Sequence, residues 1–150
     1  MKSVYAFLIT SIFTMNVFAQ EISYPEKERK VSSFELVIEG ISDIEGEVRV
    51  AVFNSEKSYG EKEDPLHAVV LEVRSDSVIW DDVELPYGKY AIAVYHDKNV
   101  NGKLDSNFLG IPKEAYGFSN NARGKFGPAS WKDAHFSIDE KTSSMSIQVK

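Results

Sequence analysis

Apolar residues recur at every second position in several short stretches of this chain, and this alternation constrains the fold more than any other feature. Residues 34–38 and 46–53 show it most clearly, with phenylalanine, leucine, isoleucine or valine at alternate positions. A two-residue period places successive side chains on opposite faces of a strand, so each stretch is expected to bury one face. The same reasoning predicts five further strands, at residues 66–73, 77–83, 90–95, 131–138 and 145–149.

Turn-forming residues separate these strands. Residues 85–88 place proline and glycine where a type I turn accepts them, and residues 139–141 are expected to close a final hairpin. The charged residues 55–64 predict a short helix or an irregular loop, and the sequence contains no long amphipathic helix. About seven short strands with intervening turns predict an all-β fold, a β-sandwich of two sheets.

One connection is much longer than the others. More than thirty residues, rich in glycine and proline, separate the strand that ends near Asp97 from the strand that starts near Trp131. A loop of this length in a compact domain is usually functional, disordered or wrongly assigned. Its aromatic residues argue for order, and we expect them to pack the loop as a cap on one end of the sandwich: Phe108, Tyr116, Phe118 and Phe126.

The N-terminus is typical of a secretory signal. Lys2 is followed by a largely apolar stretch over residues 4–17, and Val17 and Ala19 fit the −3 and −1 positions of a cleavage site. We therefore expect a signal peptide over residues 1–19, a flexible polar lead-in over residues 20–32, and one domain over residues 33–150. The apolar stretch is short for a membrane span, so no transmembrane anchor is expected after cleavage.

The net charge and the absence of cysteine disfavour or exclude several kinds of function. Loss of Lys2 with the signal changes the formal net charge from −6 to −7, which disfavours binding to nucleic acid. The chain has no cysteine, so disulfides and thiol chemistry are excluded. A secreted domain without disulfides depends for its stability on its core, on bound ions, or on both.

The most specific chemical signal is a loop with oxygen-bearing side chains at alternate positions. Asp97, Asn99, Asn101 and Asp105 have this spacing, and Gly102 stands where the chain must turn sharply. Such spacing lets a short loop direct its oxygens at a hard cation, and Ca²⁺ is the cation it suits best.

Two further positions complete the predicted cation site. The seventh position of such a loop donates a backbone carbonyl, which is that of Lys103 here, and Glu114 is the nearest downstream glutamate. Phe108 occupies the position of the usual bidentate glutamate, so the loop is not a standard EF-hand. Only two carboxylates are certain in the pattern, which predicts a weak site with a Kd of roughly 10⁻⁴ M or higher unless Glu114 joins the shell. The alternative is a metal-free loop in which Asp and Asn bond to nearby backbone.

Evidence for catalysis is weaker. Ser119, His96 and Glu114 are the residues that the long loop could assemble into a hydrolase triad, but no G-x-S-x-G elbow is present. His96 is either a donor that orients a loop carboxylate or a structural histidine. The two remaining histidines lie in separate strands without metal-ligand spacing, so zinc and copper sites are not expected.

The run over residues 85–123 resembles DUF2141, an uncharacterised family of bacterial proteins. The resemblance rests most on the segment from His96 to Ala122, and it is supported by residues 126–128 and 131–134. It extends over roughly residues 33–150. It implies a small exported domain without an established activity. The strand and turn over residues 85–94 are also similar to prealbumin-like and Cna-B-like sandwich domains, an Ig-like likeness at the level of fold.

These observations predict a periplasmic or secreted bacterial protein that is not an enzyme. We expect a binding or structural module in which a Ca²⁺ loop orders the cap, and the cap presents a surface to a glycan, a peptide or an envelope protein. Two alternatives remain open. One is a small hydrolase that uses His96, Glu114 and Ser119. The other is a metal-free structural envelope protein.

Overall fold

The computed structural model describes residues 30–150, apart from the side chain of Asp82. The predicted signal, residues 1–19, and most of the predicted lead-in lie outside the described residues. The first strand, β1 (Val31–Glu39), begins two residues before the predicted domain boundary. No helix within residues 30–150 has both the length and the hydrophobicity needed to cross a membrane.

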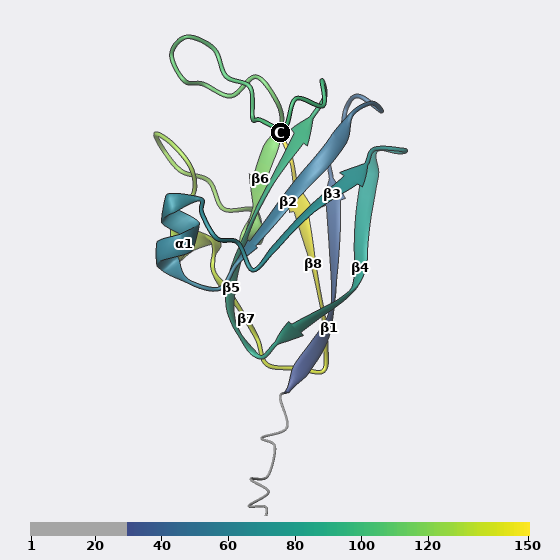
Figure 1. The fold of residues 1–150 in the computed structure, drawn as a ribbon, viewed down its shortest axis with the longest axis vertical. Coiled ribbons are helices and arrows are strands. Elements are labelled where there is room, and N and C mark those ends of the chain that lie inside the picture. Colours follow the sequence, from purple (N-terminus) through teal and green to yellow (C-terminus); the bar gives the residue numbers. More distant parts are fainter. Residues whose placement is uncertain (1–29) are drawn as a thin grey trace, which may run out of the picture.

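The described residues form two facing sheets, as predicted from the alternating pattern (Figure 1). One sheet has three strands in the order β4–β1–β8, with β1 antiparallel to β4 and parallel to β8. The other has the order β3–β2–β5–β6, and β7 also pairs with β5. Besides β1, the strands are β2 (Glu47–Phe53), β3 (His67–Glu72), β4 (Ser77–Pro86), β5 (Gly88–Asp97), β6 (Tyr116–Phe118), β7 (Phe136–Ile138) and β8 (Thr142–Gln148).

The main hydrophobic core lies between the two sheets. In β1 the side chains of Phe34, Leu36 and Ile38 are buried, while Glu35 and Glu39 on the opposite face are exposed. The alternate valines of β2 join the same core, together with side chains of β4, β5, β7 and β8. Burial of one face of each sheet is the main source of stability here. The prediction of an all-β two-sheet sandwich is confirmed.

A second hydrophobic cluster covers part of the outer face of the larger sheet. The short helices α1 (Glu56–Glu61), η1 (Ser119–Asn121) and α2 (Trp131–Ala134) lie around it. Tyr59 of α1 packs edge-on against the rings of Phe53, Phe118 and Trp131, and its hydroxyl donates to the Ala129 carbonyl at 2.9 Å. Burial, and secondarily the charge of Asp133, raises the pKa of Tyr59 to about 12. This cluster fixes the loops around the larger sheet.

The prediction of one strand over residues 131–138 was wrong in its first half. Residues 131–134 form α2, and only Phe136–Ile138 is a strand. Ser130 explains the helix: its Oγ accepts the Asp133 N–H and donates to Asp133 Oδ2 at 2.6 Å. This reciprocal cap favours a helix start.

Two predicted turns connect different sheets. Residues 139–141 do not close a hairpin, because β7 pairs with β5 whereas β8 pairs with β1. At residues 85–88 the strands β4 and β5 are separated only by a bend at Tyr87, and they also belong to different sheets. In both places the chain crosses from one layer of the sandwich to the other. Residues 55–64 contain the short helix α1, one of the two predicted alternatives.

The long connection after β5 is only partly packed. Tyr116 and Phe118 belong to the outer cluster, as expected. The expectation was wrong for Phe108 and Phe126, whose exposed fractions are 95% and 105%. Both occur in loops that project from the body of the domain, around residues 105–113 and 122–128 (Figure 1). The rings of the two projecting loops are therefore unpacked, whereas the parts of the connection that pair with β5 or touch the outer cluster are packed.

Candidate cation-binding loop

Asp97 is the last residue of β5, and the candidate loop begins there. Its side chain is fully buried. Oδ1 accepts the backbone N–H of Asn101 at 3.0 Å, and Oδ2 accepts that of Gly102 at 2.7 Å. Oδ2 also accepts a hydrogen bond from Nε of Arg49 in β2 at 2.9 Å. The buried carboxylate therefore holds the start of the loop in a tight curve.

The next predicted ligands continue this curve. Asn99 Oδ1 accepts the Asn101 N–H at 3.2 Å, and Asn101 Oδ1 accepts the Lys103 N–H at 2.8 Å. Gly102 has φ +80°, a left-handed conformation that glycine adopts without a steric penalty. Alternate side chains thus fold back toward the inside of the loop.

Asp105 closes the loop. Its Oδ2 accepts a hydrogen bond from Asn99 Nδ2 at 2.7 Å, and its Oδ1 accepts one from Asn101 Nδ2 at 3.1 Å. The structure therefore brings together the side chains of Asp97, Asn99, Asn101 and Asp105 in one turn of the chain. The backbone of Lys103 lies within the same turn.

Glu114 joins the loop from the far end of its own segment. Its Oε1 accepts the Lys98 N–H at 3.0 Å and its Oε2 accepts the Asp105 N–H at 2.8 Å, and the residue is buried. Each carboxylate oxygen keeps a free lone pair after one such bond. Glu114 therefore links both ends of the loop, and its role as a cation ligand stays a prediction.

The oxygens of this loop suit a hard cation, because carboxylate and amide oxygens are what Ca²⁺ prefers. Half of the four side chains are asparagines. Within residues 30–150, no three His, Cys, Asp or Glu side chains are grouped so that they could hold a metal ion. A cation at this loop thus depends on the neutral oxygens of Asn99 and Asn101.

Sequence reasoning missed Arg49. This residue is on the outward face of β2, and its guanidinium forms ion pairs with Asp97 and with Glu47. Burial lowers the pKa of Arg49, but its hydrogen bonds to Asp97 and Glu47 outweigh this and raise the pKa. Arg49 balances the buried charge at the base of the loop. The sequence does show an arginine among the valines of a predicted strand. That Asp97 is its partner could not be inferred, because the pairing depends on the register between β2 and β5.

Hydrogen bonds make the ionised form of Asp97 favourable. Burial alone raises the pKa of this carboxyl, but donors from Gly102, Asn101 and Arg49 together bring it below the ordinary value. A carboxyl whose pKa is lower in the folded state stabilises the fold above its unfolded pKa, about 3.9. That contribution is lost as the pH falls through the lowered pKa.

We therefore expect the wild type to lose its stability advantage over Asp97→Asn in acid. The difference in free energy of unfolding should be constant from neutral pH to about pH 4 and shrink below it. Urea titrations of both proteins at a series of pH values measure this difference. A difference that stays constant to the lowest pH would show that Asp97 ionisation does not stabilise the fold.

The three residues of the alternative hydrolase site are engaged separately. Ser119 is fully buried, and its Oγ donates to the Ala134 carbonyl at 2.6 Å and accepts the Ile92 N–H at 2.9 Å. His96 Nε2 lies 2.7 Å from the Glu45 carbonyl, which fits the structural interpretation of this histidine. Glu114 bonds to the backbone as described above. The structure does not bring the three side chains into mutual hydrogen bonds.

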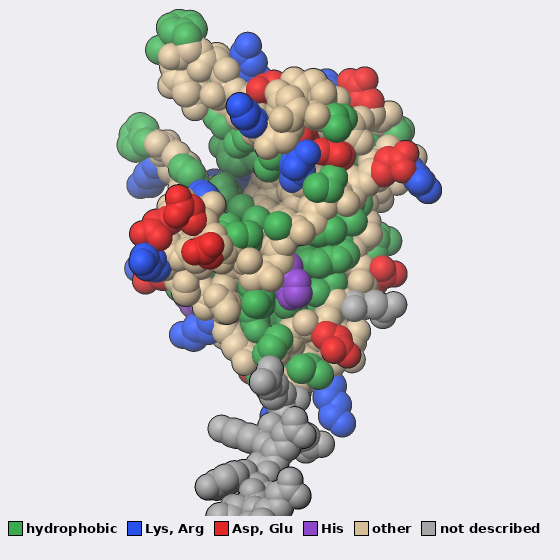
Figure 2. Space-filling model, viewed as in Figure 1, with side chains coloured by type: hydrophobic (Ala, Val, Ile, Leu, Met, Phe, Trp, Pro, Cys, Tyr) green, Lys and Arg blue, Asp and Glu red, His purple; other side chains and the backbone are tan. Residues whose placement is uncertain are grey.

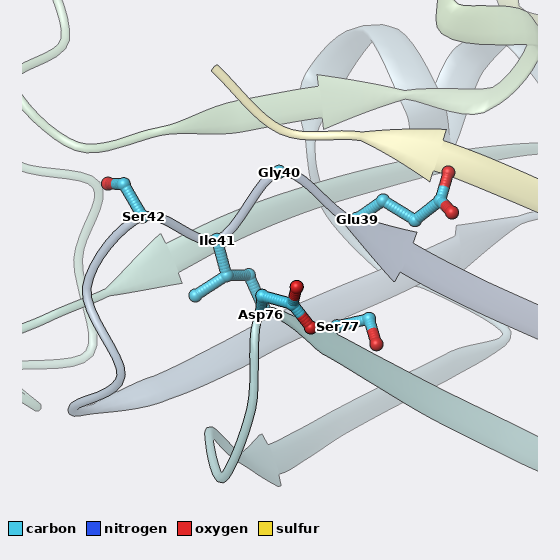
Figure 3. Close-up of a pocket in the computed structure, with 6 residues that line it drawn as sticks. All are labelled: Glu39, Gly40, Ile41, Ser42, Asp76 and Ser77. Atoms are coloured by element: carbon cyan, nitrogen blue, oxygen red, sulfur yellow. The ribbon is translucent and has the colours of Figure 1, made fainter.

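A hollow at the end of the smaller sheet also contains polar groups. It has a volume of about 460 Å³ and is lined by Glu39, Gly40, Ile41, Ser42, Asp76 and Ser77. Figure 3 shows that the oxygens of Glu39 and Ser42 lie at opposite ends and do not point toward one another. The Glu39 carboxylate accepts a hydrogen bond from Ser146 on β8. The polar groups of this hollow therefore do not converge on a common point, as those of a binding site would.

Comparison with known families gave one result. A family model described as an uncharacterised protein conserved in bacteria, DUF2141, matches residues 36–146. Comparisons with curated proteins and with solved structures found no match. The matched segment begins within β1, ends within β8, and includes the strands between them and the whole candidate loop. The chain therefore belongs to the DUF2141 family of bacterial proteins.

Proposed function

We propose that this protein is an exported, non-catalytic binding or structural domain whose loop over residues 97–105 binds Ca²⁺. The observation that carries the proposal is the position of Asp105, whose carboxylate meets the side chains of both Asn99 and Asn101. Side chains from the third, fifth and ninth loop positions thus meet, and Asp97 at the first position accepts backbone N–H groups of the same turn. The proposal of export rests on Lys2, the apolar residues 4–17 and the cleavage pattern that ends at Ala19.

Binding requires a limited rearrangement. The Asp105 oxygens exchange the amide groups of Asn99 and Asn101 for the cation, while the Asn oxygens use the lone pair left after bonding to the backbone. Asp97 Oδ1 also has a lone pair free. Because Asp97, Asp105 and Glu114 are not grouped for metal binding in the structure, the proposed ligand set, completed by the Lys103 carbonyl and Glu114, requires the loop to close further around the ion. Ca²⁺ tolerates such irregular shells of six to eight oxygens. The bound ion would hold the loop in one shape for a glycan, peptide or envelope partner.

The metal-free structural domain is the second candidate. It is favoured by the same hydrogen bonds, because Asp97 Oδ2 already accepts two donors and each oxygen of Asp105 and Glu114 accepts one. A loop closed by its own donors needs no ion to stay ordered. The two candidates therefore differ in their response to calcium.

If the loop binds Ca²⁺, the domain melts at a higher temperature when the ion is present. At a free Ca²⁺ concentration about a hundredfold above Kd, the free energy of unfolding rises by about 2.7 kcal/mol. For a domain of this size the melting temperature then rises by roughly 10 °C. Differential scanning calorimetry in Ca²⁺, in Mg²⁺ and in chelator measures the effect.

The matched variants are Asp105→Ala and Glu56→Ala. Asp105→Ala should abolish the calcium response because it removes a proposed ligand. Unlike Asp97, Asp105 is not buried at the base of the loop, so its substitution should disturb the fold less. Glu56→Ala, at an exposed carboxylate in α1, should keep the full response. Equal melting temperatures of the wild type in Ca²⁺ and in chelator would favour the metal-free candidate. A full response in Asp105→Ala would contradict the ligand assignment.

A further inference from the structure

A row of three alanines crosses the outer face of the larger sheet. Ala51 of β2 pairs with Ala68 of β3 on one side and with Ala93 of β5 on the other, and Ala93 pairs in turn with Phe118 of β6. We call Ala68, Ala51 and Ala93 the alanine row. Neighbouring strands lie about 4.8 Å apart, so the row spans roughly 10 Å. Because alanine side chains are short, the sheet surface is low along this line.

Bulky side chains border the alanine row and make it a groove. The next row across the same strands consists of Val70, Arg49, Tyr95 and Tyr116. Phe53 lies on the other side, Phe118 stands at the β6 end of the row, and Leu104 of the cation loop and Pro128 complete the lining. The groove has a volume of about 510 Å³, within the usual range for small-molecule sites. Figure 2 shows hydrophobic surface in the recess between the two projecting loops.

The groove lining contains two cationic side chains, and they differ in their partners. Arg49 is matched by Asp97 and Glu47. Lys62, at the C-terminal end of α1, has no carboxylate within ion-pair distance among the described residues. Its ammonium lies 3.5 Å from the centre of the Tyr59 ring and donates to the Tyr59 carbonyl. Desolvation lowers the pKa of Lys62.

We propose that this groove binds an aliphatic carboxylate, with the alkyl chain along the alanine row and the carboxylate at the Lys62 ammonium. The apolar floor removes the chain from water. The anion supplies the partner that Lys62 lacks, and a charge-assisted hydrogen bond is stronger than a neutral one. This inference uses residues outside the cation loop, apart from Leu104, and does not require a bound ion.

Calorimetric titration of the whole mature domain with octanoate, 1-octanol and octylammonium at neutral pH tests the charge preference. Octanoate is expected to bind saturably, with a Kd about tenfold lower than that of 1-octanol. Octylammonium is expected to bind no better than the alcohol. Absence of saturable octanoate binding, or equal affinity for octylammonium, overturns the proposal. The titrations are run both in Ca²⁺ and in chelator. Octanoate binding under both conditions shows that the groove binds its ligand whether or not the loop binds Ca²⁺.

Substitutions then test the position of the ligand. Lys62→Met should reduce octanoate affinity to that of 1-octanol, whereas Lys57→Met, at an exposed lysine of the same helix, should not change it. Ala51→Phe and Ala68→Phe fill the groove and should abolish binding. Ala68 is exposed and lies on the edge strand β3, so this variant retains the test if Ala51→Phe does not fold.

Ser144→Phe adds the same ring at an exposed position on β8 and should bind octanoate like the wild type. Unchanged affinity in Lys62→Met, or in a folded groove-filling variant, overturns the proposal. The alternative occupant of the groove is a second copy of the chain, and light scattering of the ligand-free protein tests for such a dimer. A dimer that Ala68→Phe dissociates would show that a second copy of the chain covers the groove, and it would also overturn the proposal.

Discussion

Asp97→Ala is expected to lower the free energy of unfolding by about 3 kcal/mol. The carboxylate is fully buried and accepts hydrogen bonds from Arg49 and from the backbone N–H groups of Asn101 and Gly102. Hydrogen bonds to a charged group contribute about 1.5–3 kcal/mol each, and donors left without an acceptor add a desolvation cost. Asp97→Asn keeps one acceptor oxygen and should therefore cost less.

Urea unfolding of the purified variants measures this loss, and Asp43→Ala is the control. Asp43 is an exposed carboxylate paired with Lys98, and exposed ion pairs contribute little to stability. We expect Asp43→Ala to unfold at nearly the same urea concentration as the wild type. If Asp97→Ala also unfolds at the urea concentration of the wild type, the buried hydrogen bonds at the base of the loop do not stabilise the domain.

Gly46→Ala is expected to destabilise the domain by about 2–5 kcal/mol. Gly46 precedes β2 with φ +72°, and a Cβ atom there would stand 2.4 Å from the Asp97 carbonyl oxygen and 2.7 Å from Lys98 Cα. The left-handed conformation costs an alanine about 1–2 kcal/mol, and forcing atoms into a packed site costs a further 1–3 kcal/mol. Both contacts are backbone at the start of the cation loop, so the strain is transmitted to it.

Gly60→Ala provides the matched control for this substitution. Gly60 lies within α1, its φ is not positive, and no atom lies within 4 Å of an added Cβ. Alanine is a better helix former than glycine by about 0.5–1 kcal/mol, so Gly60→Ala should keep or raise the melting temperature. Thermal unfolding of the two variants separates the effect of position from that of the residue type. Equal melting temperatures would contradict the close approach of residues 46 and 97.

The strands were largely predictable because each carries its own local pattern. Alternation in β1 and β2 indicated both the strands and the face that enters the core. Their arrangement was less accessible, because pairing depends on residues far apart in the chain. Nothing near residue 142 indicates that β8 pairs with β1 in parallel and not with β7, its neighbour in the sequence.

The candidate loop was predictable to the same degree. The spacing of Asp97, Asn99, Asn101 and Asp105 lies within one short segment, and the structure gathers these side chains in one turn. Arg49 could not be inferred, since it reaches Asp97 only through the register between β2 and β5. The alanine row escaped prediction for the same reason, because its three members are aligned by two separate strand pairings.

The parallel pairing of β1 with β8 has a consequence for biosynthesis. β1 lies between β4 and β8, so the first and last strands of the described domain are direct neighbours. Because the ribosome makes the N-terminus first, the smaller sheet stays incomplete until residues 142–148 have been translated. Contacts between such distant segments also slow the folding reaction. The nascent polypeptide thus acquires its final architecture only after synthesis is nearly finished, and a premature stop before residue 142 leaves β1 with a bare edge.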